Sequence, residues 1–288
     1  KSARSVRPAP QSRGFRGSIC DASSVRVAVD RMAETHIALA PQVGGFLLAS
    51  AVTTITRSIL TKDQVDAWGW RVPFLFSLLL APLLYNIVKQ TEESKLWSER
   101  SEQKETEVMI RETENADRPA VVDLFSSPFR RRQLVGMIGV LGSVTSSFYT
   151  LFLWTPVYLS ELRGIMREQD ADLMNFVVVG FYIFFLISCG YMSDKFEHRM
   201  DLFRIGFPGI IVGAPAMFAM FESESVLGYF FAQVRFAFCL ALCEGGKAAW
   251  EVELWMADPT LSFTGVAIGH NIAATLFGGT LPLMATFL

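Results

Sequence analysis

The chain has 288 residues, of which 51% are hydrophobic and 19% are charged, against roughly 25% charged residues in soluble domains. This composition argues against a soluble enzyme, which needs more polar surface. The net charge of −2 gives no general attraction to nucleic acid, so no nucleic-acid partner is predicted. The charges gather in 1–36, 91–132 and a few short loops, which leaves long stretches nearly free of them.

Seven apolar stretches follow one another, each close to the ~20 residues that a bilayer-spanning helix needs. They are 37–60, 70–89, 133–160, 171–193, 203–221, 226–250 and 263–288. The first is the weakest, because Arg57 and several threonines lie inside it. Residues 202–221 are apolar all round, whereas a helix of a large soluble bundle shows one polar face. The sequence therefore predicts an all-α membrane protein with about seven transmembrane helices.

Basic residues predict the orientation of these helices, since Lys and Arg gather at cytoplasmic helix ends. Residues 1–36 hold seven Lys and Arg against three acids, 91–132 ends in three consecutive arginines, and 194–204 holds three more basic residues. The three intervening loops are acidic or mixed, as expected outside the cell. The loop 251–262 is an exception, because it would be cytoplasmic yet carries only acids. We therefore expect the N-terminus to be inside.

One long hydrophilic connection, 91–132, divides the helices into two groups. Its charges of both signs alternate at helical spacing, as on a solvated surface. We expect a cytoplasmic N-terminal segment in 1–36, two helices in 37–90, a central cytoplasmic loop in 91–132, and five helices in 133–288.

The sixth apolar stretch carries charges, which a membrane helix tolerates where they pair or line a polar cavity. Glu244, Lys247 and Glu251 are spaced i, i+3, i+7 and share one helix face. Arg235, nine residues before Glu244, is placed on that side as well. These four residues are the candidates for the solute pathway and its coupling. For Glu251 and Glu253, a position at the cytoplasmic interface is the alternative.

The last apolar stretch combines polar groups with helix-bending residues. Gly278, Gly279 and Pro282 predict a bent or closely packed helix. Asn271 is a further pathway candidate, since its amide can bond a solute or a neighbouring helix. Histidine is the residue type that ordinarily titrates near neutral pH, which makes His270 a candidate proton-binding group, and the alternative is an interfacial histidine without a role in transport.

Several of these segments resemble a known transporter family. WGWRVPF at 68–74, GYMSDKFEHR at 190–199 and FTGVAIGHNIAATLFGGTLPL at 263–283 look like the major facilitator superfamily. More narrowly, they resemble the metabolite:proton symporters, the group of the proline/betaine and α-ketoglutarate permeases. The resemblance implies a partial bundle that holds helices 5–11 of the family's twelve, with 91–132 as the central loop.

The same resemblance assigns gating positions to the turn between the fourth and fifth helices. The residues that take the family's gating-loop positions are Gly190, Ser193, Asp194, Lys195, His198 and Arg199. Glu253 takes the acidic position that ends the tenth helix. An acid followed by bases at a cytoplasmic turn allows ion pairs to form and break, and the alternative is a plain charged turn. Glu197 departs from the family, which usually has Gly there.

The sequence thus predicts a multi-pass secondary transporter in the plasma membrane, surrounded by lipid. Its partners would be protons and a small organic acid or zwitterionic solute. Two alternatives are a truncated, non-transporting or regulatory protein of the same family, and a membrane-embedded enzyme. No HExxH, CxxC or phosphate-binding glycine pattern occurs, so no catalytic residue, metal, cofactor or ATP-driven step is predicted.

Overall fold

A computed structural model describes residues 35–90, 119–193, 195–196, 200–223, 225–255 and 259–287. The chain divides into two compact units, 1–34 and 35–288, and the described residues all belong to the second. Every regular element of this described part is a helix. The elements are α2 (Thr35–Ile59), α3 (Lys62–Ala67), η1 (Gly69–Arg71), α4 (Val72–Gln90), α6 (Ala120–Ser126), α7 (Pro128–Tyr149), η2 (Thr150–Trp154), α8 (Thr155–Val157), η3 (Tyr158–Leu162), α9 (Glu168–Ser193), α10 (Met200–Phe221), α11 (Val226–Glu253), α12 (Pro259–Ala273), η4 (Ala274–Gly279) and α13 (Leu281–Phe287).

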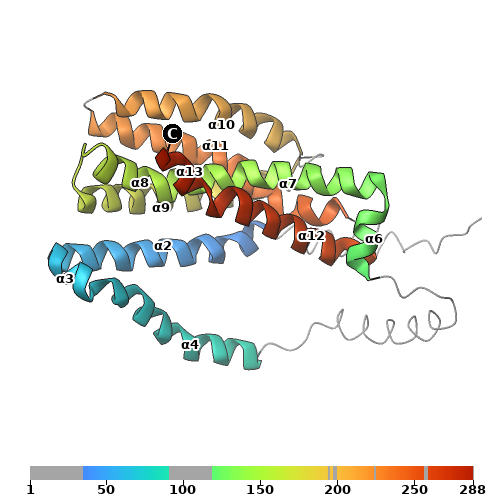
Figure 1. Ribbon diagram of the computed structural model, residues 1–288, viewed down its shortest axis with the longest axis horizontal. Helices are drawn as coiled ribbons and strands as arrows, with labels where there is room; N and C mark the ends of the chain where they lie inside the picture. Colours follow the sequence, from blue (N-terminus) through green and yellow to red (C-terminus); the bar gives the residue numbers. More distant parts are fainter. Residues whose placement is uncertain are drawn as a thin grey trace, which may run out of the picture. The chain divides into compact units, whose positions relative to one another are not determined.

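Helices form over all seven apolar stretches, with ends a few residues from those predicted (Figure 1). Five segments within the described residues are long and apolar enough to cross a membrane. They are Pro128–Leu162, Glu168–Ser193, Met200–Phe221, Val226–Glu253 and Leu261–Phe287. α2 adds a shorter apolar helix, Val43–Ile59. The prediction of an all-α membrane fold is confirmed.

The start of α7 differs from the prediction. α7 begins at Pro128, and the short helix α6 precedes it, so the end of the predicted 91–132 loop is helical. Proline suits a first helical turn because its missing N–H is not needed there. α6 packs against α12 through the fully buried Leu124. Residues 91–118 of the predicted loop lie outside the described part.

Glycines set the closest contact between α10 and α11. A Cβ at Gly206 would lie 2.4 Å from Sγ of Cys243, and one at Gly213 would lie 3.3 Å from Cδ2 of Phe236. Residue numbers rise along α10 while they fall along α11, so these neighbouring helices run antiparallel (Figure 1). Small residues let helix backbones approach in this way.

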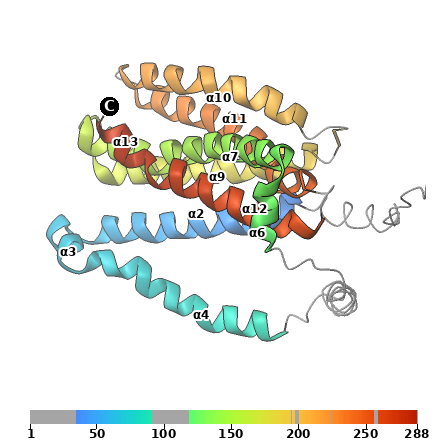
Figure 2. The ribbon, with the colours of Figure 1, turned by 45° about the vertical axis from the view of Figure 1, so that its right-hand side comes forward.

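α7 and the last span lie side by side and run in the same direction (Figure 2). A Cβ at Gly269 would lie 2.9 Å from Sδ of Met137, and one at Gly278 would lie 2.8 Å from Cγ2 of Thr145. Residue numbers therefore rise together along both helices. This agrees with spans that cross the membrane alternately, since three spans, an odd number, lie between the two.

An aromatic core connects α2 to the later helices. The ring centroid of Phe46 on α2 lies 5.5 Å from that of Phe148 on α7. Phe152 lies 4.9 Å from Phe148 and 5.0 Å from the buried Tyr182 of α9. Tilted and edge-to-face ring pairs at these distances are favourable beyond their buried area. The core therefore holds residues from both predicted groups of helices.

Three segments of the spans are π-helical: η2, η3 and η4. Polar side chains support the backbone at η2. Nδ2 of Asn175 on α9 donates to the carbonyl oxygen of Phe152 at 3.2 Å, and Oγ1 of Thr155 donates to that of Thr150 at 2.8 Å. π-Helical turns occur frequently at functional sites, and η4 packs against α7.

Candidate functional site

The predicted charged face of α11 is buried in the bundle. Glu244, Lys247 and Glu251 are 8%, 8% and 5% exposed. Nζ of Lys247 lies 2.5 Å from Oε2 of Glu244, one helical turn away. Charges buried in this way require a partner, because removing an ion from water costs several kcal/mol. Glu244 and Lys247 therefore compensate each other within α11.

Glu251 has its partner on α12. Nδ1 of His270 lies 3.2 Å from Oε2 and 3.4 Å from Oε1 of Glu251. The Glu251 side chain is buried, whereas that of His270 is partly exposed. The sequence left open whether His270 is only interfacial, and the structure joins it to a buried carboxylate. We call Glu244, Lys247, Glu251 and His270 the charged cluster.

The charged cluster changes its net charge with the protonation of His270. With a protonated imidazole, two anions and two cations balance. With a neutral imidazole, one negative charge remains among buried groups, which is costly inside a membrane. Histidine is the side chain that ordinarily titrates between pH 5 and 8. The arrangement is therefore suited to bind and release one proton.

Tyr182 of α9 lies within electrostatic range of the charged cluster. It is fully buried, and it is close enough to Glu244 to interact with it electrostatically. No local pattern in the sequence marks this tyrosine, because a site residue and a core residue look alike within an apolar stretch. Tyr182 is thus a member of the aromatic core that also interacts electrostatically with Glu244.

Arg235 does not belong to the charged cluster. Nine residues make about two and a half helical turns, so Arg235 and Glu244 lie on opposite faces of α11. The expectation that they share a side is wrong. Arg235 is exposed, on the same face as the exposed side chains of Phe231 and Phe238.

Two other candidates, on α11 and α12, lie on different helix faces from the members of the charged cluster. Asn271 is exposed, and its Nδ2 donates to the carbonyl oxygen of Ala267 in its own helix at 2.7 Å. Glu253 ends α11 and is partly buried. Residues two apart do not share a helix face, so Glu253 does not lie beside Glu251.

The predicted gating loop is described in part. Three of its six residues lie outside the described residues: Asp194, His198 and Arg199. Gly190 and Ser193 are buried at the end of α9, and a Cβ at Gly245 would lie 2.8 Å from the backbone nitrogen of Gly190. α9 and α11 thus approach to backbone contact. Nζ of Lys195 lies 4.2 Å above the ring of Tyr191.

The predicted helix-packing residues of the last span differ in their surroundings. A Cβ at Gly278 would lie 2.8 Å from Thr145 and 2.9 Å from Tyr149 on α7. A Cβ at Gly279 would meet nothing within 4 Å. Pro282 lies in the first turn of α13. Of the two glycines, Gly278 is therefore the one that packs closely against α7.

Gly265 of α12 lies against the indole of Trp255, which is buried. A Cβ there would lie 2.4 Å from Cε2 of the indole. Gly265→Ala is therefore expected to destabilise the purified protein by about 1–3 kcal/mol in thermal unfolding. The double variant Gly265→Ala, Trp255→Leu should lose less stability than the sum of the losses of the two single variants, because the indole that obstructs the new methyl group is gone. Gly279→Ala is the control, and equal stability of Gly265→Ala and Gly279→Ala would contradict the contact.

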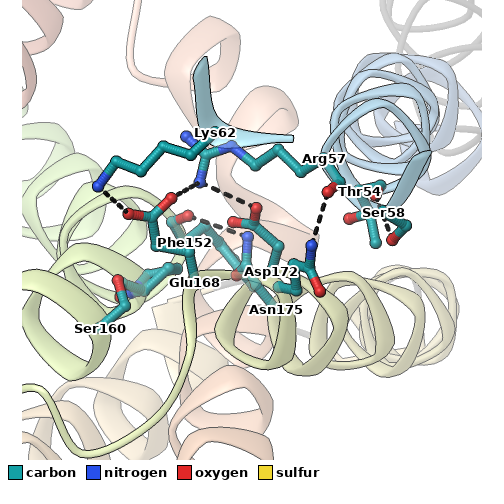
Figure 3. Close-up of polar contacts among 11 residues, drawn as sticks. Thr54, Arg57, Ser58, Lys62, Phe152, Ser160, Glu168, Asp172 and Asn175 are labelled. Atoms are coloured by element: carbon teal, nitrogen blue, oxygen red, sulfur yellow. Dashed lines mark hydrogen bonds and ion pairs between the residues drawn. The ribbon is translucent and has the colours of Figure 1, made fainter. Parts of the chain in front are cut away.

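A second polar cluster, which the sequence did not predict, joins α2 and α3 to α9 (Figure 3). Nη1 of Arg57 lies 3.1 Å from Oδ2 of Asp172 and 3.6 Å from Oε2 of Glu168. Nζ of Lys62 lies 3.4 Å from Oε1 of Glu168. We call these four residues the α2–α9 ion-pair cluster. The available signal was Arg57 inside an apolar stretch, since such an arginine needs a partner.

A bundle of apolar helices with paired charges buried inside it defines an integral, multi-pass membrane protein. The family model described as Major Facilitator Superfamily matches residues 24–281, and the chain belongs to this family. The resemblance seen in the sequence is confirmed. The family is one of transporters, so the chain is not an enzyme.

Curated relatives match most of this chain. A citrate-proton symporter of Klebsiella pneumoniae is 22% identical over 84% of this chain and 51% of its own length. A putative proline/betaine transporter of Staphylococcus haemolyticus is 26% identical over 85% and 49%, and a proline/betaine transporter of Salmonella typhimurium is 23% identical over 85% and 48%. The chain spans about half the length of these relatives. No solved structure gives a significant match.

Proposed function

We propose that this chain is part of a proton-coupled secondary transporter that carries a small organic acid or zwitterion across the plasma membrane. Membership of the superfamily supports transport. The relatives are named as a citrate-proton symporter and as proline/betaine transporters. Citrate is an organic acid, and proline and betaine are zwitterions. The observation that carries the coupling is the buried charged cluster, in which His270 pairs with Glu251.

The proposed topology divides the helices between the two halves of a transporter. Residues 37–90 would complete the first half, 133–288 would supply most of the second, and 91–132 would connect them in the cytoplasm. Residues 1–36 would also be cytoplasmic. Such halves rock about a site near the midplane and expose it to each side in turn. The charged cluster lies within the proposed second half.

Charge balance gives a physical reason for coupling an organic anion to a proton. A carboxylate that enters the buried site alone adds a negative charge to the membrane interior, which is costly. One carboxylate entering together with one proton on the Glu251–His270 pair leaves the net charge unchanged. Lys247 is the cation best placed to attract the solute carboxylate, once Glu244 has released it.

The test is uptake into vesicles that contain the full-length protein. An inward proton gradient is expected to drive accumulation of the solute, tested over a panel of organic acids and zwitterions. Glu251→Gln should reduce accumulation to the level found without a gradient, because the carboxylate that stabilises the protonated His270 is lost. Glu161→Gln, an exposed acid at the end of a span, is the matched control.

The outcomes of this assay are distinct. Uptake that is unchanged when the gradient is collapsed would remove proton coupling from the proposal. Coupled uptake by Glu251→Gln would remove the Glu251–His270 pair from it. No uptake of any solute by the parent protein would favour the alternative, a non-transporting member of the family.

A further inference from the structure

The α2–α9 ion-pair cluster lies where the two proposed halves meet (Figure 3). Both cations, Arg57 and Lys62, come from the end of α2 and the start of α3. Both carboxylates, Glu168 and Asp172, come from the first turns of α9. Each ion pair described between residues 35–90 and 119–287 belongs to this cluster. The contact between the proposed halves therefore contains two cations facing two anions.

The side chains of this cluster differ in how deeply they are buried. The Asp172 side chain is 18% exposed and its pair with Arg57 is the shortest, whereas the Lys62 side chain is 76% exposed. Nε2 of Gln169 on α9 also donates to the backbone oxygen of Arg57 at 2.8 Å. Arg57 is thus held through both its side chain and its backbone, and it is the centre of the contact.

One turn further inward, the same helices carry buried oxygen atoms without a hydrogen-bond partner. These are Oγ1 of Thr54 on α2 and Oδ1 of Asn175 on α9, whose side chain is 8% exposed (Figure 3). A buried polar atom without a partner costs free energy. Separating α2 from α9 at this end would let water reach both atoms. The packed arrangement of α2 on α9 therefore includes the free-energy cost of these two unpaired atoms. Separation of the helices removes that cost, as suits a contact that must open.

We propose that the α2–α9 ion-pair cluster is a reversible closure at the outer end of the solute pathway. Arg57 and Asp172 hold α2 against α9 in the closed arrangement, and their pair breaks when this end opens. The loop charges assign this end to the outside, and the inference rests on the proposed division into halves. Partly exposed ion pairs are individually weak, so such a closure breaks without a large barrier.

The closure is tested by labelling a cysteine at Thr54 with a membrane-impermeant thiol reagent added from outside. The full-length protein is used, and labelling of the protein without Thr54→Cys is subtracted to account for native cysteines. Arg57→Gln is expected to raise the labelling rate about fivefold, because it removes two pairs of Arg57 at once. Lys62→Gln should raise it less than twofold.

Two further variants make the test specific. Arg57→Asp and Asp172→Arg should each label fast, and combining them should restore slow labelling by exchanging the charges. Arg167→Gln is the matched control: Nε of Arg167 pairs with Oδ2 of Asp170 at 2.8 Å at the same end, but within one half. It should label like the parent.

Labelling of Arg57→Gln no faster than that of Arg167→Gln would overturn the closure. If Arg57→Gln does not fold, the charge-exchanged double variant decides: slow labelling supports the closure and fast labelling contradicts it. The readout needs neither solute nor proton gradient. A failure of proton coupling in the vesicle assay therefore leaves this result intact, and the two proposals fail separately.

Discussion

Lys247→Met is expected to destabilise the protein by about 3–5 kcal/mol, because it leaves the buried Glu244 carboxylate without its partner. Nζ of Lys247 lies 2.5 Å from Oε2 of Glu244, and both side chains are buried. Little water is therefore available to replace the lost cation. Methionine keeps much of the length of the lysine stem, so the loss reports the charge rather than a cavity. Thermal unfolding of the purified protein at neutral pH measures it.

The double variant Glu244→Gln, Lys247→Met separates stability from function. It removes both charges, and such replacement of a buried pair is often neutral or even stabilising. We expect stability close to that of the parent, together with loss of gradient-driven uptake. Lys62→Met, at an exposed lysine, is the control and should change stability by no more than about 0.5 kcal/mol. A Lys247→Met protein as stable as this control would show that the pair does not support the fold.

Gly245→Ala is expected to cost about 3 kcal/mol or more in the same unfolding measurement. A Cβ at Gly245 would lie 2.8 Å from the backbone nitrogen of Gly190 and 2.9 Å from the backbone carbon of Cys189. Backbone atoms cannot rotate away as the end of a side chain can, so α9 and α11 would have to separate. Glu244 is the adjacent residue, and its pairing with Lys247 would be disturbed as well.

Gly180→Ala is the matched control for Gly245→Ala. Gly180 also lies within a long apolar helix, α9, but a Cβ there would meet nothing within 4 Å. Alanine favours a helix over glycine by about 1 kcal/mol, so Gly180→Ala should be at least as stable as the parent. If both glycine variants unfold at the same temperature, α9 and α11 do not approach as closely as the structure places them.

Features that depend on neighbouring positions in the chain were predictable. The bilayer sets the length of a span, so apolar length alone gave all seven helical regions. Helical spacing put Glu244 and Lys247 on one face, where they pair. The same spacing rule applied strictly puts Arg235 half a turn away, which corrects its predicted side.

Features that depend on the packing of distant segments were not predictable. Arg57 and Asp172 are 115 residues apart, and no local pattern connects an arginine at the end of one helix with an aspartate at the start of another. Glu251 and His270 meet for the same reason, through the packing of α12 on α11. Tyr182 lies in an apolar stretch as ordinary core residues do, and its electrostatic interaction with Glu244 follows from the packing of α9 against α11.

The π-helical segment η4 has a consequence for residues beyond it. Each i→i+5 turn holds one residue more than an α-helical turn. The helix that follows is therefore rotated by about 100° relative to an uninterrupted α-helix. A helical wheel that is correct for His270 misplaces Pro282 and the rest of α13. Solvent accessibility measured residue by residue along Leu261–Phe287 would repeat at the helical period, and the positions of its maxima would shift by about one residue at Ala274–Gly279.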